Sequence, residues 1–96
     1  MKSEYLDNLR GAVSALHECA CFHSATTHVT ETFQGDKVWD GDVETFTLTG
    51  HTTADEAFAW AFDNGKEPQY IAVLRLPPIN EPVDAVRAAI ASGAFR

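Results

Sequence analysis

The spacing of apolar residues predicts a helix at each end of the chain. In residues 4–17, apolar side chains recur at intervals of three and four positions, which is typical of a helix with one buried face. These side chains are Leu6, Leu9, Val13 and Leu16. A last helix is expected to begin at Pro82, because proline is favoured in a first helical turn, and to end at Gly93.

Alternating residues in the middle of the chain predict a β-hairpin. Residues 21–33 and 38–49 are rich in Thr, Val and Phe, which suit strands, and Gln34-Gly35-Asp36 between them has the composition of a tight turn. In the second strand the apolar positions change parity. This change predicts a bulge near Glu44 or Thr45, or a strand that bends over the core.

A helix and a third strand are predicted to follow the hairpin. Thr53 and Glu56 have the spacing of a capping box, and the helix that they would begin ends at Asn64-Gly65. Its buried face would consist of Ala54, Ala57, Phe58, Ala61 and Phe62. Residues 70–76 are almost continuously apolar, which favours a buried strand.

These elements predict a single α+β domain over residues 1–96. The expected fold is a two-layer sandwich of order αββαβα, in which a three-stranded, mainly antiparallel sheet carries its helices on one face. The strand order is left open, because a strand that returns through a helix can run in either direction.

Charge excludes several classes of partner. Acidic residues number 14 against 7 basic ones, and the basic residues never form a run. Nucleic acid and anionic membranes are therefore not expected to bind, since both need basic patches. Neither a membrane span nor a signal peptide is predicted, so we expect a cytoplasmic protein whose two cysteines are free thiols.

The candidate chemical groups do not form a recognisable catalytic or metal site. His17, Cys19, Cys21 and His23 alternate along one strand, which spreads them over ~20 Å, whereas zinc needs four donors around one ion. A cysteine nucleophile activated by His23, His28 or His51 would lack a basic neighbour and an oxyanion hole. We therefore predict no metal, no cofactor and no catalytic residue.

Acidic and aromatic residues of the hairpin have structural interpretations. Asp36, Asp40, Asp42 and Glu44 lack the spacing of a calcium loop, and we interpret them as charges that protect a hairpin edge. Trp39 and Trp60 are assigned to core packing.

A polar sheet face is the predicted binding surface. With all helices on one face, the other face would be open, and threonines of neighbouring strands would gather there around His28. Thr26, Thr30 and Thr32 share one parity, and Thr45, Thr47 and Thr49 share one on the next strand. A protein partner or a second copy of the chain is expected to use this face or an edge strand. The surface residues chosen are His28, Thr30, Thr32, Thr45, Thr47 and His51.

Residues after about position 28 resemble a group of small bacterial proteins that contain a domain of unknown function. The resemblance rests on turn glycines, core aromatics and a strand that ends in two prolines. The residues that carry it are Phe33, Gly35, Val38, Trp39, Gly41, Val43, Phe46, Leu48, Gly50, His51, Ala59, Trp60, Ala72, Val73, Leu74, Leu76, Pro77 and Pro78. It implies a fold and supplies neither an activity nor catalytic residues.

Two functions follow from these observations. The first is a small non-enzymatic module that binds another protein, which rests on size, acidity and the lack of a catalytic constellation. The alternative is a small ligand-binding protein or enzyme that uses His51, His28 or the cysteines, and it requires a cavity of at least ~300 Å³ lined by those groups. The partner, the pathway and the oligomeric state are left open by the sequence.

Overall fold

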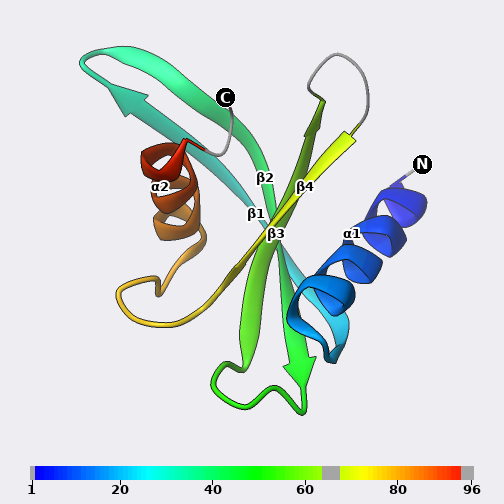
Figure 1. The fold of residues 1–96 in the computed structure, drawn as a ribbon. Helices are drawn as coiled ribbons and strands as arrows, with labels where there is room; N and C mark the ends of the chain where they lie inside the picture. The colour runs from blue at the N-terminus through cyan, green and yellow to red at the C-terminus, as the bar shows by residue number, and fades with distance from the viewer. Residues whose placement is uncertain (1, 64–67, 94–96) are drawn as a thin grey trace.

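A four-stranded antiparallel sheet with one helix on each side makes up the fold (Figure 1). The computed structural model describes residues 2–63 and 68–93. The elements are α1 (Lys2–His17), β1 (Ala20–Phe33), β2 (Asp36–Thr49), β3 (Glu56–Asp63), β4 (Pro68–Leu74) and α2 (Pro82–Ser92). Each strand pairs with the next one in sequence, in the order β1-β2-β3-β4. The α+β class is confirmed, but the order is αββββα, and the prediction of three strands is wrong.

The predicted helix over residues 53–64 is instead the strand β3. Alanines and aromatic residues alternate along it, and both faces are buried: Ala59 is 0% exposed and Trp60 1%. A helix with the predicted apolar stripe would have left Trp60 outside that stripe, so the strand buries more apolar surface. Thr53 does not cap a helix, and the predicted cap at Gly65 lies outside the described residues.

The two helices pack on opposite faces of the sheet, which corrects the prediction that they share one face. Leu9 and Val13 of α1 lie in one apolar cluster with Phe46 and Ala57. Phe58, which follows Ala57 along β3, lies instead in the cluster of α2. Because successive residues of a strand point to opposite faces, α1 and α2 must lie on different sides, as Figure 1 also shows.

The apolar positions of β2 change parity because the two helices cover opposite faces of the sheet. Val43 is buried in the cluster of α2, and Phe46 is buried in the cluster of α1. The strand therefore stays regular at Glu44 and Thr45. Its buried side chains lie on the face of α2 up to Val43 and on the face of α1 from Phe46 onward. The extra residue at this level is Ser24 of β1, since His23 pairs with Phe46 and Ala25 pairs with Thr45.

The turn of the first hairpin and the two ends of α2 follow the predicted signals. Gln34 and Gly35 both have positive φ, 52° and 85°, as a two-residue hairpin turn of the primed type requires. Glu81 precedes α2, and its backbone N–H donates to Asp84 Oδ2 over 3.0 Å, which satisfies one free donor at the helix start. Gly93 ends α2 with φ of 77°.

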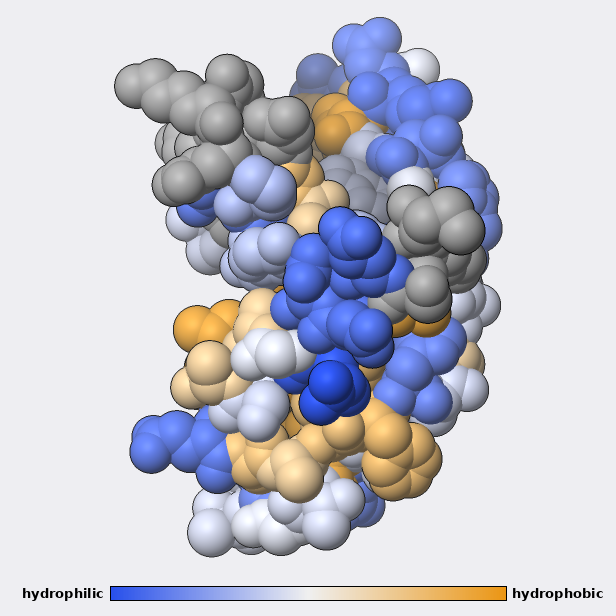
Figure 2. All heavy atoms as spheres, turned by 90° about the vertical axis from the view of Figure 1, so that its right-hand side faces the viewer, coloured by the Kyte–Doolittle hydropathy of each residue, from blue (hydrophilic) through white to orange (hydrophobic). Residues whose placement is uncertain are grey.

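The side that carries α1 is mostly polar (Figure 2). Hydrophilic residues cover the middle of this surface, and apolar residues gather toward its lower end. Leu16 at the end of α1 is 58% exposed and Phe22 at the start of β1 is 56% exposed. Neither of the two helices in the described part of the chain is long and apolar enough to cross a membrane.

We expect Leu9→Ala to lower the free energy of unfolding by about 2–5 kcal/mol, because it opens a cavity at a side chain that is 1% exposed. Leu16→Ala removes the same atoms from an exposed position of the same helix, and its effect should stay within about 0.5 kcal/mol. Urea denaturation of both variants measures the difference. Equal losses would contradict the packing of α1 on the sheet.

Candidate binding site

The sheet divides into two arms above its centre (Figure 1). β1 pairs with β2 along almost its whole length, whereas the pairing of β2 with β3 covers only Glu44 to Thr47. β3 and β4 continue to pair with each other as far as Asp63. Beyond Glu44 the two pairs of strands therefore diverge. The space between them is a cavity of about 500 Å³, here called the hairpin cleft. It is lined by Tyr5, Trp39, Asp40, Gly41, Asp42, Glu44, Trp60, Ala61 and Phe62.

One wall of the hairpin cleft is the unpaired edge of β2. The backbone N–H of Leu48 donates to Asp55 O over 2.7 Å, so even-numbered residues of this part of β2 turn their backbone groups toward β3. The register places Glu44 opposite Ala59, and the next rung would join Asp42 to Ala61. That rung is not formed. Among the described strands, none pairs with Asp40 or Asp42 on this side.

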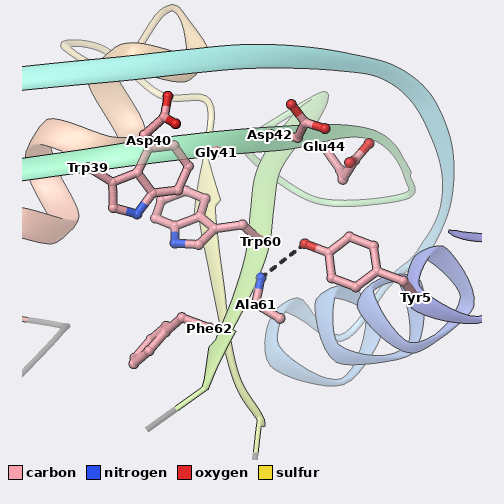
Figure 3. A pocket seen from close by; sticks show the side chains of 9 residues that line it. All are labelled: Tyr5, Trp39, Asp40, Gly41, Asp42, Glu44, Trp60, Ala61 and Phe62. Atoms are coloured by element: carbon pink, nitrogen blue, oxygen red, sulfur yellow. Dashed lines mark hydrogen bonds between the residues drawn. The ribbon is translucent and has the colours of Figure 1, made fainter.

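On the opposite wall, which β3 forms, the hydroxyl of Tyr5 replaces the backbone acceptor that β2 would have offered to Ala61 (Figure 3). The backbone N–H of Ala61 donates to this hydroxyl over 3.2 Å. Tyr5 reaches the cleft because α1 packs across β3 and β4. Burial raises the pKa of Tyr5, the Ala61 N–H lowers it, and the charges of Glu44 and Asp42 raise it further. The Ala61 donor of the β3 wall is thus satisfied, whereas no described strand pairs with the backbone donors of Asp40 and Asp42 on the β2 wall.

Two indoles close the cleft on the side of α2. The rings of Trp39 and Trp60 meet edge to face, with centroids 5.6 Å apart and planes at 67°. A Cβ at Gly41 would lie 3.2 Å from the indole of Trp39, so the missing side chain lets this ring lie across the strand. Figure 3 shows Phe62 further along β3, below the indoles. Trp60 packs in the core as predicted, while Trp39 is only partly buried.

Acidic side chains lie on the opposite side of the same strand. Glu44 is 1% exposed, and its Oε1 lies 2.8 Å from His23 Nε2 and also accepts the Thr26 hydroxyl. Asp40 and Asp42 share the parity of Glu44, so all three carboxylates belong to the face that α1 covers further along the sheet. The cleft therefore has acidic groups along one side and aromatic rings along the other.

His28 joins the two exposed carboxylates of this group. Its Nδ1 lies 3.0 Å from Asp42 Oδ1, and its Nε2 lies 2.9 Å from Asp40 Oδ1. The bonds to Asp42 and then to Asp40 raise the pKa of His28. Thr30 donates to Asp40 over 2.7 Å, and this bond, followed by the one to His28, lowers the pKa of Asp40.

The predicted threonine surface is not continuous, and this prediction is wrong. Thr30 and His28 share a face with the carboxylates of β2, whereas Thr45 and Thr47 have odd parity and point to the other side. Thr45 is buried, with 7% of its surface exposed. Thr32 lies near the turn and is exposed.

His51 lies in the connection between β2 and β3, away from the hairpin cleft. Its Nδ1 accepts the backbone N–H groups of Thr53 and Ala54, both over 3.1 Å, so its ring organises this turn. Its ring centroid lies 6.2 Å from that of His17.

The cysteines are free thiols, and both are half-buried. Burial, followed by the neighbouring Cys19, raises the pKa of Cys21, which disfavours the thiolate that a nucleophile needs. Within the described residues, no group of three or more His, Cys, Asp or Glu side chains is placed to hold a metal ion.

No family model, curated protein or solved structure matches this chain. The resemblance to small bacterial proteins of unknown function stays a prediction. The geometry of the hairpin cleft is therefore the basis on which a function can be argued. Sequence reasoning missed Tyr5, Gly41 and Phe62 as parts of a site, and it assigned Asp40, Asp42 and Glu44 only to the protection of a hairpin edge. The alternate positions of these three acids were the signal that could have placed them on one face.

We expect Tyr5→Phe to lower the free energy of unfolding by about 0.5–1.5 kcal/mol, because the Ala61 N–H loses its acceptor. Tyr70→Phe removes a hydroxyl from a residue that is 38% exposed and serves as the control. Urea denaturation gives the stabilities, and amide exchange of Ala61 measured by NMR should become faster in Tyr5→Phe. Unchanged exchange at Ala61 would contradict the role of the hydroxyl.

The pH dependence of the hairpin provides a further test. Because the pKa of His28 is raised above 6.5 in the fold, its bonds to the carboxylates stabilise the protein fully below pH 6.5. This contribution is lost as the pH rises through the raised pKa. An NMR titration of the His28 ring should give a pKa above 6.5, and the Asp40→Asn/Asp42→Asn variant should bring it back toward 6.5. An identical pKa in both proteins would show that the carboxylates do not hold the ring.

Proposed function

We propose that the protein is a non-enzymatic, cytoplasmic interaction module that binds a basic segment of a partner protein in the hairpin cleft. The observation that carries this proposal is the composition of the cleft. It combines two indoles and Phe62 with Asp40, Asp42 and Glu44, and no Lys, Arg or His is among its described lining residues.

Lysine and arginine side chains fit this composition. Their charged tips can pair with the carboxylates on one side of the cleft, while apolar parts of the same segment lie against the indoles on the other side. The net charge of -7 favours the approach of a basic partner over that of a second copy of the chain.

The alternative of an enzyme or small-ligand site has less support. His51, His28 and the two cysteines are not among the residues that line the hairpin cleft. A hollow beside His28, which Thr30, Glu81 and Val83 also line, has a volume of about 260 Å³. This is below the ~300 Å³ that such sites usually need.

Selection from a display library of random twelve-residue peptides tests the proposal. We expect the enriched peptides to contain Lys or Arg, and isothermal titration should show that salt weakens their binding. Asp42→Asn should weaken binding by about two- to fivefold, the range for one exposed ion pair.

Asp36→Asn is the matched control, because Asp36 is an exposed acid of the same hairpin that lies outside the lining of the cleft. Its binding should equal that of the wild type. Enriched peptides without basic residues, no enrichment at all, or equal losses in the two variants would each contradict the proposal.

A further inference from the structure

We infer that the partner segment binds as an added antiparallel β-strand along the free edge of β2, with a basic, an apolar and a basic residue in succession. This inference rests on the proposed function and specifies the conformation and sequence pattern of the segment that the hairpin cleft takes.

The backbone of β2 is prepared for such a strand. Asp40 and Asp42 turn their N–H and C=O groups into the cleft, in continuation of the bonded residues Glu44, Phe46 and Leu48. An exposed edge of this kind is a template for another extended chain. An added strand could bond to the backbones of Asp40 and Asp42, which are separated by one residue. These two positions define a site for a segment of three residues.

The opposite wall does not compete for the segment. The Ala61 N–H, which would face an incoming strand from β3, already donates to the Tyr5 hydroxyl. The two walls therefore differ in what they offer: β2 presents unpaired backbone groups, and β3 presents a satisfied donor together with aromatic side chains. This asymmetry assigns the added strand to β2.

The side chains of β2 set the sequence pattern. Residues directly opposite each other in neighbouring strands point to the same face and contact each other. Residues opposite Asp40 and Asp42 would thus lie on the side of the carboxylates, where basic side chains form ion pairs. The residue between them would lie opposite Gly41, on the side of Trp39 and Trp60.

Gly41 favours an apolar residue at this central position. Gly41 has no side chain, so the indole of Trp39 lies across it. The central residue of the added strand would therefore contact this indole. The indole of Trp60 lies next to that surface. A side chain such as Val or Ile buries its apolar area there, whereas a charged one would lose hydration without a partner.

Amide hydrogen exchange of the unmodified protein tests strand addition directly. The N–H groups of Asp40 and Asp42 face the cleft, and those of Gly41 and Val43 face β1, so the latter pair is an internal control. Saturation with a peptide enriched in the library selection should slow exchange at Asp40 and Asp42 by about tenfold or more. Exchange at Gly41 and Val43 should be slow already in the free protein and should change little.

Backbone methylation of the same peptide gives a second readout. In antiparallel pairing, the residues opposite Asp40 and Asp42 donate their own N–H groups, so N-methylation at either basic residue should weaken binding by about tenfold. N-methylation at the central apolar residue should be tolerated, because its N–H faces away from β2. The enriched peptides should also show Lys or Arg at positions separated by one apolar residue.

Each outcome decides between the two proposals. Strand addition would be overturned, and the proposed function left standing, by one set of results. In that set, basic peptides bind but lack the alternating pattern, do not protect Asp40 and Asp42, and tolerate both methylations equally. A selection that enriches no basic peptide would overturn the proposed function and strand addition together.

Discussion

The early end of the ladder between β2 and β3 is the constraint on which the rest of the structure depends. Pairing stops after the rung of Glu44 and Ala59, although both strands continue beyond it. Strands in a sheet twist relative to their neighbours, and long two-stranded ribbons twist the most. The β1–β2 hairpin has strands of 14 residues, so its outer half turns away from the shorter strands β3 and β4.

The two helices lie on opposite faces of the sheet and pack mainly against different strands. α2 packs against β1 and β2, and α1 packs mainly against β3, β4 and the beginning of β1. Each helix thus packs mainly on one arm of the sheet. The edge-to-face pair of Trp39 and Trp60 joins the two arms, and the bond between Ala61 and Tyr5 holds α1 on the β3 wall of the hairpin cleft.

The sequence predicts the elements whose local signals agree and fails where two periodicities overlap. The first helix has a consistent apolar stripe, the last helix has start and end signals, and the first hairpin has a clear turn. In β3 the positions Ala57, Phe58, Ala61 and Phe62 fit a helical stripe as well as two faces of a strand. Trp60 distinguishes the two, because only the strand buries it. The site was less predictable, since Tyr5 and Ala61 are 56 residues apart and no local pattern relates them.

The charge around Asp40 and Asp42 changes with pH through His28. Thr30 and His28 lower the pKa of Asp40, so this carboxylate keeps its charge to a lower pH than a free aspartate does. When His28 takes up a proton, its positive charge lies between Asp40 and Asp42 and strengthens the pairing of β1 with β2. That proton also reduces the negative field along the edge of β2, which is the field that would attract the proposed basic partner. Because the pKa of His28 is raised, this change of charge takes place above pH 6.5.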